Sequence, residues 1–109
     1  MVRFHLEREG FRVTEAAGGR ETLDLLHAEK PDVLLLDLTM PDVDGLQVLE
    51  EATANGLLKG VRVAVLTGDA DEVNERRGRK AGADAYLVKP LEATDLTRAV
   101  RRLLAEDDA

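Results

Sequence analysis

Three polar side chains follow apolar stretches of this chain at the points where predicted strands end. They are Asp37, Thr67 and Lys89. Because the carboxyl ends of parallel strands meet at one edge of a sheet, we expect a carboxylate, a hydroxyl and an ammonium group to lie close together. A carboxylate can attack phosphorus, and the other two groups can hold the oxygens of a transferred phosphoryl group. The alternative is three solvated strand ends that carry no chemistry.

Strand and helix patterns alternate along the chain. Runs typical of strands occur at 11–16, 32–38, 61–68 and 84–90, and helical periodicity occurs at 18–29, 44–55 and 92–106. Residues 32–38 are apolar on both faces, which is typical of a strand covered on both sides. The last helix has apolar residues at helical spacing, namely Leu96, Ala99, Val100, Leu103 and Leu104. The alternation predicts an α/β fold with a parallel sheet between helix layers.

Residues 70–80 give the weakest helical pattern. Gly78 lies inside the expected helix, where glycine costs about 1 kcal/mol relative to alanine. Val73 is almost the only large apolar residue available to anchor the segment. We therefore expect this helix to be short or mobile.

Composition excludes several classes of protein. A chain of 109 residues with 44% hydrophobic and 34% charged residues fits a single globular domain. Its net charge of −7 and its three aromatic residues argue against direct nucleic-acid binding. No apolar run approaches the roughly 20 residues of a membrane span, so we expect no membrane contact. The absence of cysteine is compatible with the cytoplasm, which is the expected location.

Four motifs resemble the receiver domains of two-component response regulators. In order, they are "PDVLLLDLTMPDVDGLQVL", "VAVLTG", "GADAYLVKP" and "DLTRAVRRLL". The resemblance extends from about residue 3 to residue 104 and implies a flavodoxin-like fold with three layers. It also implies a receiver domain over residues 1–105, followed by a short acidic tail at 106–109.

The resemblance implies a role for each residue at the strand ends. In the family, the aspartate that matches Asp37 accepts a phosphoryl group from a histidine kinase. The residue that matches Thr67 contacts that group and moves on activation, and the lysine that matches Lys89 pairs first with the aspartate and then with the phosphate. The aromatic residue that matches Tyr86 changes rotamer together with Thr67. Asp37, Thr67 and Lys89 are thus the expected catalytic set, and Thr67 and Tyr86 the expected switch.

The resemblance also assigns three neighbouring positions. The backbone carbonyl that matches Thr39 binds Mg²⁺ in the family, and the side chain there tunes dephosphorylation. Gly45 matches a glycine that ends the loop after the acceptor, and Pro90 matches a proline that follows a cis peptide bond.

The chain departs from the family at its start. Receivers open with a buried strand that ends in a pair of acidic residues holding Mg²⁺, whereas this chain opens inside the first helix with "MVRFHLEREGFRV". Asp37 is then the one obvious carboxylate for the metal. Because a hard cation with a single protein carboxylate binds weakly, we expect weak Mg²⁺ binding.

Three functions compete for this sequence. The expected one is a stand-alone receiver that takes a phosphoryl group from a histidine kinase or phosphotransfer protein and signals to a downstream effector. The second is a degenerate receiver that acts as an interaction module independently of phosphorylation. The third, an aspartate-nucleophile phosphatase, is disfavoured because such enzymes need a second acid where Thr39 stands. We therefore expect no enzyme.

The absence of the family's first strand should leave backbone groups of the sheet unpaired. In the family it lies between the strands that match 11–16 and 32–37, so its loss leaves two unpaired edges. Each unmade buried backbone hydrogen bond costs roughly 1–3 kcal/mol, and the chain must close the gap. Strand 11–16 could pair directly with 32–37 in a four-stranded sheet, or a second copy could supply the pairing. We expect the second route, a homodimer.

Overall fold

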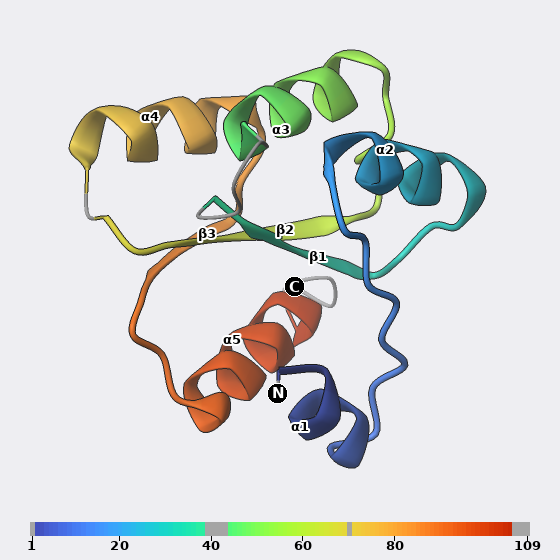
Figure 1. Ribbon diagram of the computed structural model, residues 1–109, viewed down its shortest axis with the longest axis vertical. Coiled ribbons are helices and arrows are strands. Elements are labelled where there is room, and N and C mark those ends of the chain that lie inside the picture. The colour runs from blue at the N-terminus through green and yellow to red at the C-terminus, as the bar shows by residue number, and fades with distance from the viewer. Residues whose placement is uncertain (1, 39–43, 70, 106–109) are drawn as a thin grey trace.

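The chain folds into three layers, with a parallel sheet between two layers of helices (Figure 1). The computed structural model describes residues 2–38, 44–69 and 71–105. Along the chain the order is α1 (Val2–Arg8), α2 (Gly19–Ala28), β1 (Val33–Asp37), α3 (Gly45–Ala54), β2 (Arg62–Thr67), α4 (Glu72–Ala81), β3 (Ala85–Val88) and α5 (Ala93–Ala105). Helices α2, α3 and α4 cover one face of the sheet, and α1 and α5 cover the other. The predicted α/β class is confirmed.

Strand β2 lies at the centre of the sheet, whose strand order is β1-β2-β3. Both neighbours run parallel to it, with Leu35 opposite Ala64 and Val65 opposite Tyr86. Every residue of β2 after Arg62 is buried, because helices cover both faces and strands cover both edges. The core cluster around β2 consists of Leu36, Leu49, Val61, Val63, Val65, Ala81 and Ala83.

Asp84 fixes the register of β3 against β2. Its backbone N–H donates to the carbonyl of Val63 at 2.8 Å, and its carboxylate accepts from the N–H of Val63, also at 2.8 Å. Two bonds to one residue hold the start of β3 at a single position along β2. The side chains that follow are thereby assigned to defined faces of the sheet.

The predicted strand at 11–16 is wrong. These residues have no regular secondary structure, and the sheet of the described residues has three strands rather than four. The segment runs between the α1 layer and the α2 layer, on the β1 side of the molecule (Figure 1). A strand needs a hydrogen-bonded neighbour, and 11–16 does not reach β1. Direct pairing of the two segments, one of the two expected ways to close the gap, therefore does not occur in this structure.

The sequence predicted that the helix at 70–80 is short or mobile, and the first of these alternatives is wrong, because α4 is as long as α2 and α3. Val73, the expected anchor, is 63% exposed, and the buried residues of α4 are Gly78 and Ala81. Asp71 caps the first turn by accepting from two backbone N–H groups. Arg77 donates two hydrogen bonds to Glu50 of α3, at 2.8 and 3.0 Å. Capping and close packing offset the cost of glycine.

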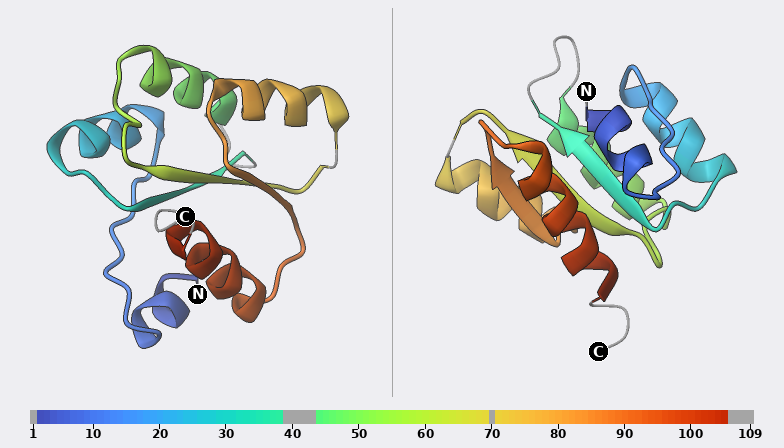
Figure 2. Two further views of the ribbon diagram at one scale, coloured as in Figure 1. Left: turned by 180° about the vertical axis from the view of Figure 1, so that it is seen from behind. Right: turned by 90° about the horizontal axis from the view of Figure 1, so that it is seen from below.

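Helix α5 packs its apolar stripe on the sheet as predicted, with Leu96, Val100 and Leu103 buried. Helix α1 lies beside it under the sheet (Figure 2). An ion pair of 2.9 Å between Arg101 of α5 and Glu9, just beyond α1, joins the two helices. The structure thus keeps a covered lower layer although α1 has only seven residues.

Within the described ranges, none of the helices combines the length and the apolar character that crossing a membrane requires.

Gly45 begins α3 where the helix approaches the end of β1. A Cβ atom at this position would lie 2.5 Å from Cδ2 of Leu38, 3.5 Å from its Cα and 3.6 Å from the carbonyl oxygen of Asp37. A side chain at this position would push Cδ2 of Leu38 aside, so glycine lets α3 start close to the end of β1 with Leu38 in place. Gly45 therefore helps to set where Asp37 lies.

Replacing Gly45 with alanine should lower the free energy of unfolding by roughly 0.5–1.5 kcal/mol, because Leu38 must leave its rotamer. Urea denaturation followed by circular dichroism measures this change. Gly18→Ala is the matched control, since a Cβ atom there meets nothing within 4 Å. Combining Gly45→Ala with Leu38→Ala should cost less than the sum of the two, and an additive result would contradict the proposed clash.

Candidate functional site

The parallel strands bring Asp37, Thr67 and Lys89 to one edge of the sheet. Asp37 is the last residue of β1, Thr67 is the last residue of β2, and Lys89 follows the last residue of β3. The backbone N–H of Lys89 donates to the carbonyl of Thr67 at 2.7 Å, which ties the chain after β3 to the end of β2. The sequence predicted this arrangement from the position of each residue in its apolar run.

Asp37 and Lys89 form an ion pair across the end of the sheet. Nζ of Lys89 lies 2.7 Å from Oδ2 of Asp37, and both side chains are 34% exposed. The two residues lie 52 positions apart in the sequence, so the fold and not local chain geometry creates the contact. The pair places a cation directly beside a carboxylate that solvent can still reach.

Thr67 is 5% exposed and directs its hydroxyl into its own turn. Oγ1 accepts from the backbone N–H of Asp69 at 3.1 Å and lies 3.3 Å from the carbonyl oxygen of Asp69, to which it donates. Its hydrogen bonds therefore go to Asp69 rather than to Asp37 or Lys89. Sequence reasoning missed this use of Asp69, because bonds within a turn leave no periodic signal.

The ring of Tyr86 packs beneath α4 at the position of Gly78. A Cβ atom on Gly78 would lie 3.4 Å from Cε2 of Tyr86 and 3.3 Å from Cδ2 of Leu46. Glycine at this point therefore makes room for the aromatic ring. The sequence marks Gly78 as an irregularity of the helix, and its contacts give the physical reason for it.

The hydroxyl of Tyr86 is buried and has no hydrogen-bond partner among the described residues. Burial raises the pKa of Tyr86, and the charges of Glu75, Asp71 and Asp69 raise it further, while the nearby hydroxyl of Thr67 acts in the opposite direction. The hydroxyl has lost its hydration, and the neighbouring Thr67 hydroxyl compensates this loss only weakly. The inward position of the ring thus depends mainly on packing.

Three further residues were predicted to belong to the site, and the structure describes two of them. The peptide bond between Lys89 and Pro90 is cis. Gly45 lies against Leu38 and the carbonyl of Asp37, as described above. Thr39, predicted to offer its backbone carbonyl to Mg²⁺, lies outside the described residues.

The described residues fit a resident metal ion poorly. Across residues 2–38, 44–69 and 71–105, no three side chains of His, Cys, Asp or Glu lie close enough together to hold one. Asp37 itself is engaged by Lys89. A divalent cation at this edge would depend largely on ligands other than these side chains.

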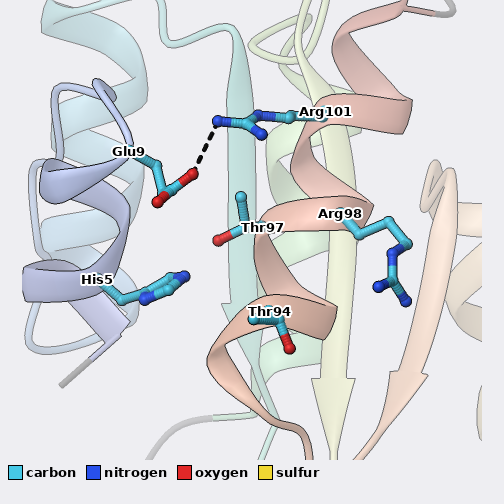
Figure 3. A pocket seen from close by; sticks show the side chains of 6 residues that line it. All are labelled: His5, Glu9, Thr94, Thr97, Arg98 and Arg101. Carbon is cyan, nitrogen blue, oxygen red and sulfur yellow. Dashed lines mark hydrogen bonds and ion pairs between the residues drawn. The ribbon is translucent and has the colours of Figure 1, made fainter.

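A hollow of about 300 Å³ lies between α1 and α5, away from this edge. Figure 3 shows its lining, with Glu9 paired to Arg101 across the hollow and Arg98 directed away from α1. His5 and Thr97 complete the space between the helices. The ion pair serves the packing of the two helices, and the candidate site remains the edge with Asp37.

Tyr86 is the only tyrosine of a chain without tryptophan, so ultraviolet absorbance titration follows it alone. Its pKa should lie above the ordinary value of about 10 in the folded protein and return to it in denaturant. The unfolded chain then loses its proton first, so the free energy of unfolding should fall as the pH rises above about 10.

Gly78→Ala should displace the ring and lower the pKa of Tyr86 toward its ordinary value. Gly18→Ala, which touches nothing, should leave it unchanged. An unaltered titration in Gly78→Ala would show that the ring does not depend on this glycine.

Comparison with known proteins supports the same conclusion as the geometry. A family model described as the response regulator receiver domain matches residues 1–101. A receiver domain protein (CheY-like) from Methanospirillum hungatei shares 34% identity and a TM-score of 0.89, covering 98% of this chain and 84% of its own. A response regulator from Burkholderia pseudomallei, solved with a phosphorylated aspartic acid and a calcium ion, shares 31% identity with a TM-score of 0.83. That match covers 98% of this chain and 62% of the other.

Among curated proteins, the transcriptional regulatory protein SrrA of Staphylococcus aureus is 34% identical over 104 residues. The match covers 95% of this chain, which spans 42% of the length of that regulator. Receiver domains are signalling modules of two-component systems, and they generally bind Mg²⁺ at the site of phosphorylation. The family model, the fold and the edge with Asp37, Thr67 and Lys89 together place this chain in the response regulator receiver domain family.

Proposed function

We propose that Asp37 accepts a phosphoryl group from a histidine kinase or phosphotransfer protein, and that the domain passes the signal to a downstream effector by protein contacts. The observation that carries this proposal is the ion pair of 2.7 Å between Asp37 and Lys89, at an edge that also holds Thr67. A carboxylate that solvent can reach, with a cation beside it, has the reactivity and the charge balance that phosphoryl transfer needs.

The proposed step moves one phosphoryl group and conserves charge. A carboxylate oxygen of Asp37 forms a bond to phosphorus while the N–P bond of the donor phosphohistidine breaks. The electron pair of that bond stays on the imidazole, which leaves. The ammonium of Lys89 then lies beside the new acyl phosphate and neutralises part of its added negative charge.

Thr67 and Tyr86 would connect this step to the surface. A hydroxyl that turns from Asp69 toward a phosphoryl oxygen gives up its bonds of 3.1 and 3.3 Å within the turn. Its movement changes the space around the ring of Tyr86, which packs against Gly78 of α4. Helix α4 is therefore the proposed surface through which partners sense the state of Asp37.

A degenerate receiver, which binds partners without phosphorylation, is the second candidate. It is favoured by the described residues, which contain no group of three metal-ligating side chains. The two candidates differ in one property, which is whether a covalent adduct forms at Asp37.

Acetyl phosphate should add one phosphoryl group to the chain, and intact-mass spectrometry should find it. Asp37→Asn should abolish the adduct, because an amide is not a nucleophile toward phosphorus. Asp32→Asn is the matched control at the opposite end of β1, and it should leave the adduct unchanged. An adduct that persists in Asp37→Asn would contradict the assignment of Asp37 as the phosphoryl acceptor. If no adduct forms in the unaltered chain, the degenerate receiver is favoured.

The Mg²⁺ concentration needed for half-maximal adduct should exceed that of a receiver whose acidic pair is intact. Few protein ligands mean weak binding of a hard cation. The same titration on such a receiver is the control, and an equal requirement would contradict the proposed weak site.

The switch predicts that Thr67 and Lys89 act on Tyr86 as one unit. Phosphorylation should change the absorbance and fluorescence of Tyr86 in the unaltered chain. Lys89→Ala should retain some adduct but lose most of the tyrosine response, and Thr67→Ala should do the same. In a double-mutant cycle the two losses should overlap, so purely additive effects would refute the coupling.

Three expectations from the sequence remain predictions. They are the stand-alone arrangement, the cytoplasmic location and the homodimer. A regulator such as SrrA is much longer than this chain, so an output within the same polypeptide is the alternative to a separate effector. Light scattering of the chain in solution measures its oligomeric state and tests the homodimer.

A further inference from the structure

Helix α4 packs on the rest of the domain with very little apolar surface. Its buried residues are Gly78 and Ala81, whereas α5 buries Leu96, Val100 and Leu103. Hydrophobic stabilisation grows with the apolar area that is removed from water, and glycine and alanine contribute the least area. The docking of α4 therefore depends on polar contacts more than the docking of α5 does.

Hydrogen bonds tie the C-terminal end of α4 to its surroundings. The hydroxyl of Thr53, in α3, donates to the carbonyl of Ala81. The backbone N–H of Ala83 donates to the carbonyl of Gly78 at 3.0 Å, which closes the turn between α4 and β3. The last turn of α4 is thus held both by the neighbouring helix and by the chain that leads into the sheet.

The first half of α4, residues 72–77, is tied to α3 by one ion pair. Arg77 donates to both carboxylate oxygens of Glu50 in the neighbouring α3, at 2.8 and 3.0 Å (Figure 1). Within the described part of the chain, the other side-chain hydrogen bonds of this half stay within α4 and its cap at Asp71. Val73 is largely exposed and adds little apolar contact.

Solvent reaches both members of this ion pair, because the side chain of Arg77 is 41% exposed and that of Glu50 is 44% exposed. The hydrogen bonds from Arg77 lower the pKa of Glu50, so the carboxylate stays charged at neutral pH. Water and salt screen an exposed ion pair, and its net contribution is therefore modest. The pair is closed in this structure, but a competing charge can open it.

Opening of α4 from this end would change what solvent and partners can reach. The helix has ten residues, and isolated helices shorter than about 12–15 residues are marginally stable in water. The first half of α4 therefore unwinds readily once it leaves α3. Because Gly78 lies against Leu46 and the ring of Tyr86, such an opening would expose part of both side chains.

We propose that the ion pair between Arg77 and Glu50 is a latch, which holds the first half of α4 on α3 and limits its opening about the fixed C-terminal end. A partner that places a charged group on Arg77 or Glu50 would release α4 without any change at Asp37. The latch is thus a second input to α4. This inference goes beyond the phosphorylation of Asp37 and does not depend on it.

Arg79 provides a contrast on the same helix. Its Nε lies 3.1 Å from Oε2 of Glu75, which is also part of α4. A pair four residues apart stabilises the helix that contains it, but it does not attach that helix to a neighbour. The latch therefore predicts different effects for two arginines of α4 that carry the same charge.

The test is native-state hydrogen exchange of the full chain, labelled with ¹⁵N and measured by NMR without any phosphodonor. Arg77→Gln should speed exchange of the Glu75 and Arg76 amides at least about threefold, because loss of the ion pair favours the open form of α4. The amide of Ala83, at the fixed end, and that of Val100 in α5 should stay within about twofold of their original rates, since the opening is local.

Arg79→Gln is the matched control. It removes the same charge from α4, and it should change exchange of the Glu75 and Arg76 amides by less than about twofold, as expected for one pair within a helix. Glu50→Arg should speed exchange as Arg77→Gln does. Combining Glu50→Arg with Arg77→Glu should restore most of the original protection, because the pair is rebuilt with its charges exchanged. Circular dichroism checks that each variant is folded.

Several results would overturn the proposal. Unchanged exchange in Arg77→Gln would mean that other contacts hold the first half of α4. Equal acceleration at Ala83 and Val100 would show a loss of stability of the whole domain rather than a local opening. Equal acceleration by Arg79→Gln would assign the effect to the helix itself, and a charge-exchanged pair that restores no protection would show that the two residues do not act through each other.

Discussion

Parallel pairing of β1 and β3 to one buried strand is the constraint on which this structure depends. Every residue of β2 after Arg62 is buried, so the backbone of this strand must be satisfied by its two neighbours. Once both neighbours run in the same direction as β2, their carboxyl ends coincide at one edge. The ion pair between Asp37 and Lys89 follows from this, since neither residue is near the other in sequence.

Sequence patterns predicted the parts of the fold that depend on local burial. Apolar runs marked three strands within about two residues of their ends, and they placed Asp37, Thr67 and Lys89 at the same edge. The pattern failed at 11–16, where the residues have the alternation of a strand but no neighbour to pair with. Strand formation is a property of two segments, and one segment cannot reveal it alone.

Helix α4 shows the opposite error of sequence-based prediction, because a helix expected to be weak is present at ordinary length. Its sequence lacks large apolar side chains, and propensity alone predicts a weak helix. The structure uses the absence of a side chain at Gly78 to bring α4 onto Leu46 and Tyr86. Arg77 adds two bonds to Glu50, so α3 and α4 are joined at their surface as well as through the ring. Helix propensity scales measure the effect of a residue on its own helix. They do not include the close packing of neighbouring side chains that a glycine permits.

Asp84 has a consequence for which side of the sheet carries the tyrosine. Side chains alternate between faces along a strand, so a slip of one residue in β3 would exchange the faces of all its side chains. Tyr86 would then turn toward the α5 layer, out of reach of Gly78. The two bonds between Asp84 and Val63 fix which side chains of β3 face each side of the sheet. One carboxylate at the start of a short strand thus decides which of the two helix layers contacts the aromatic ring.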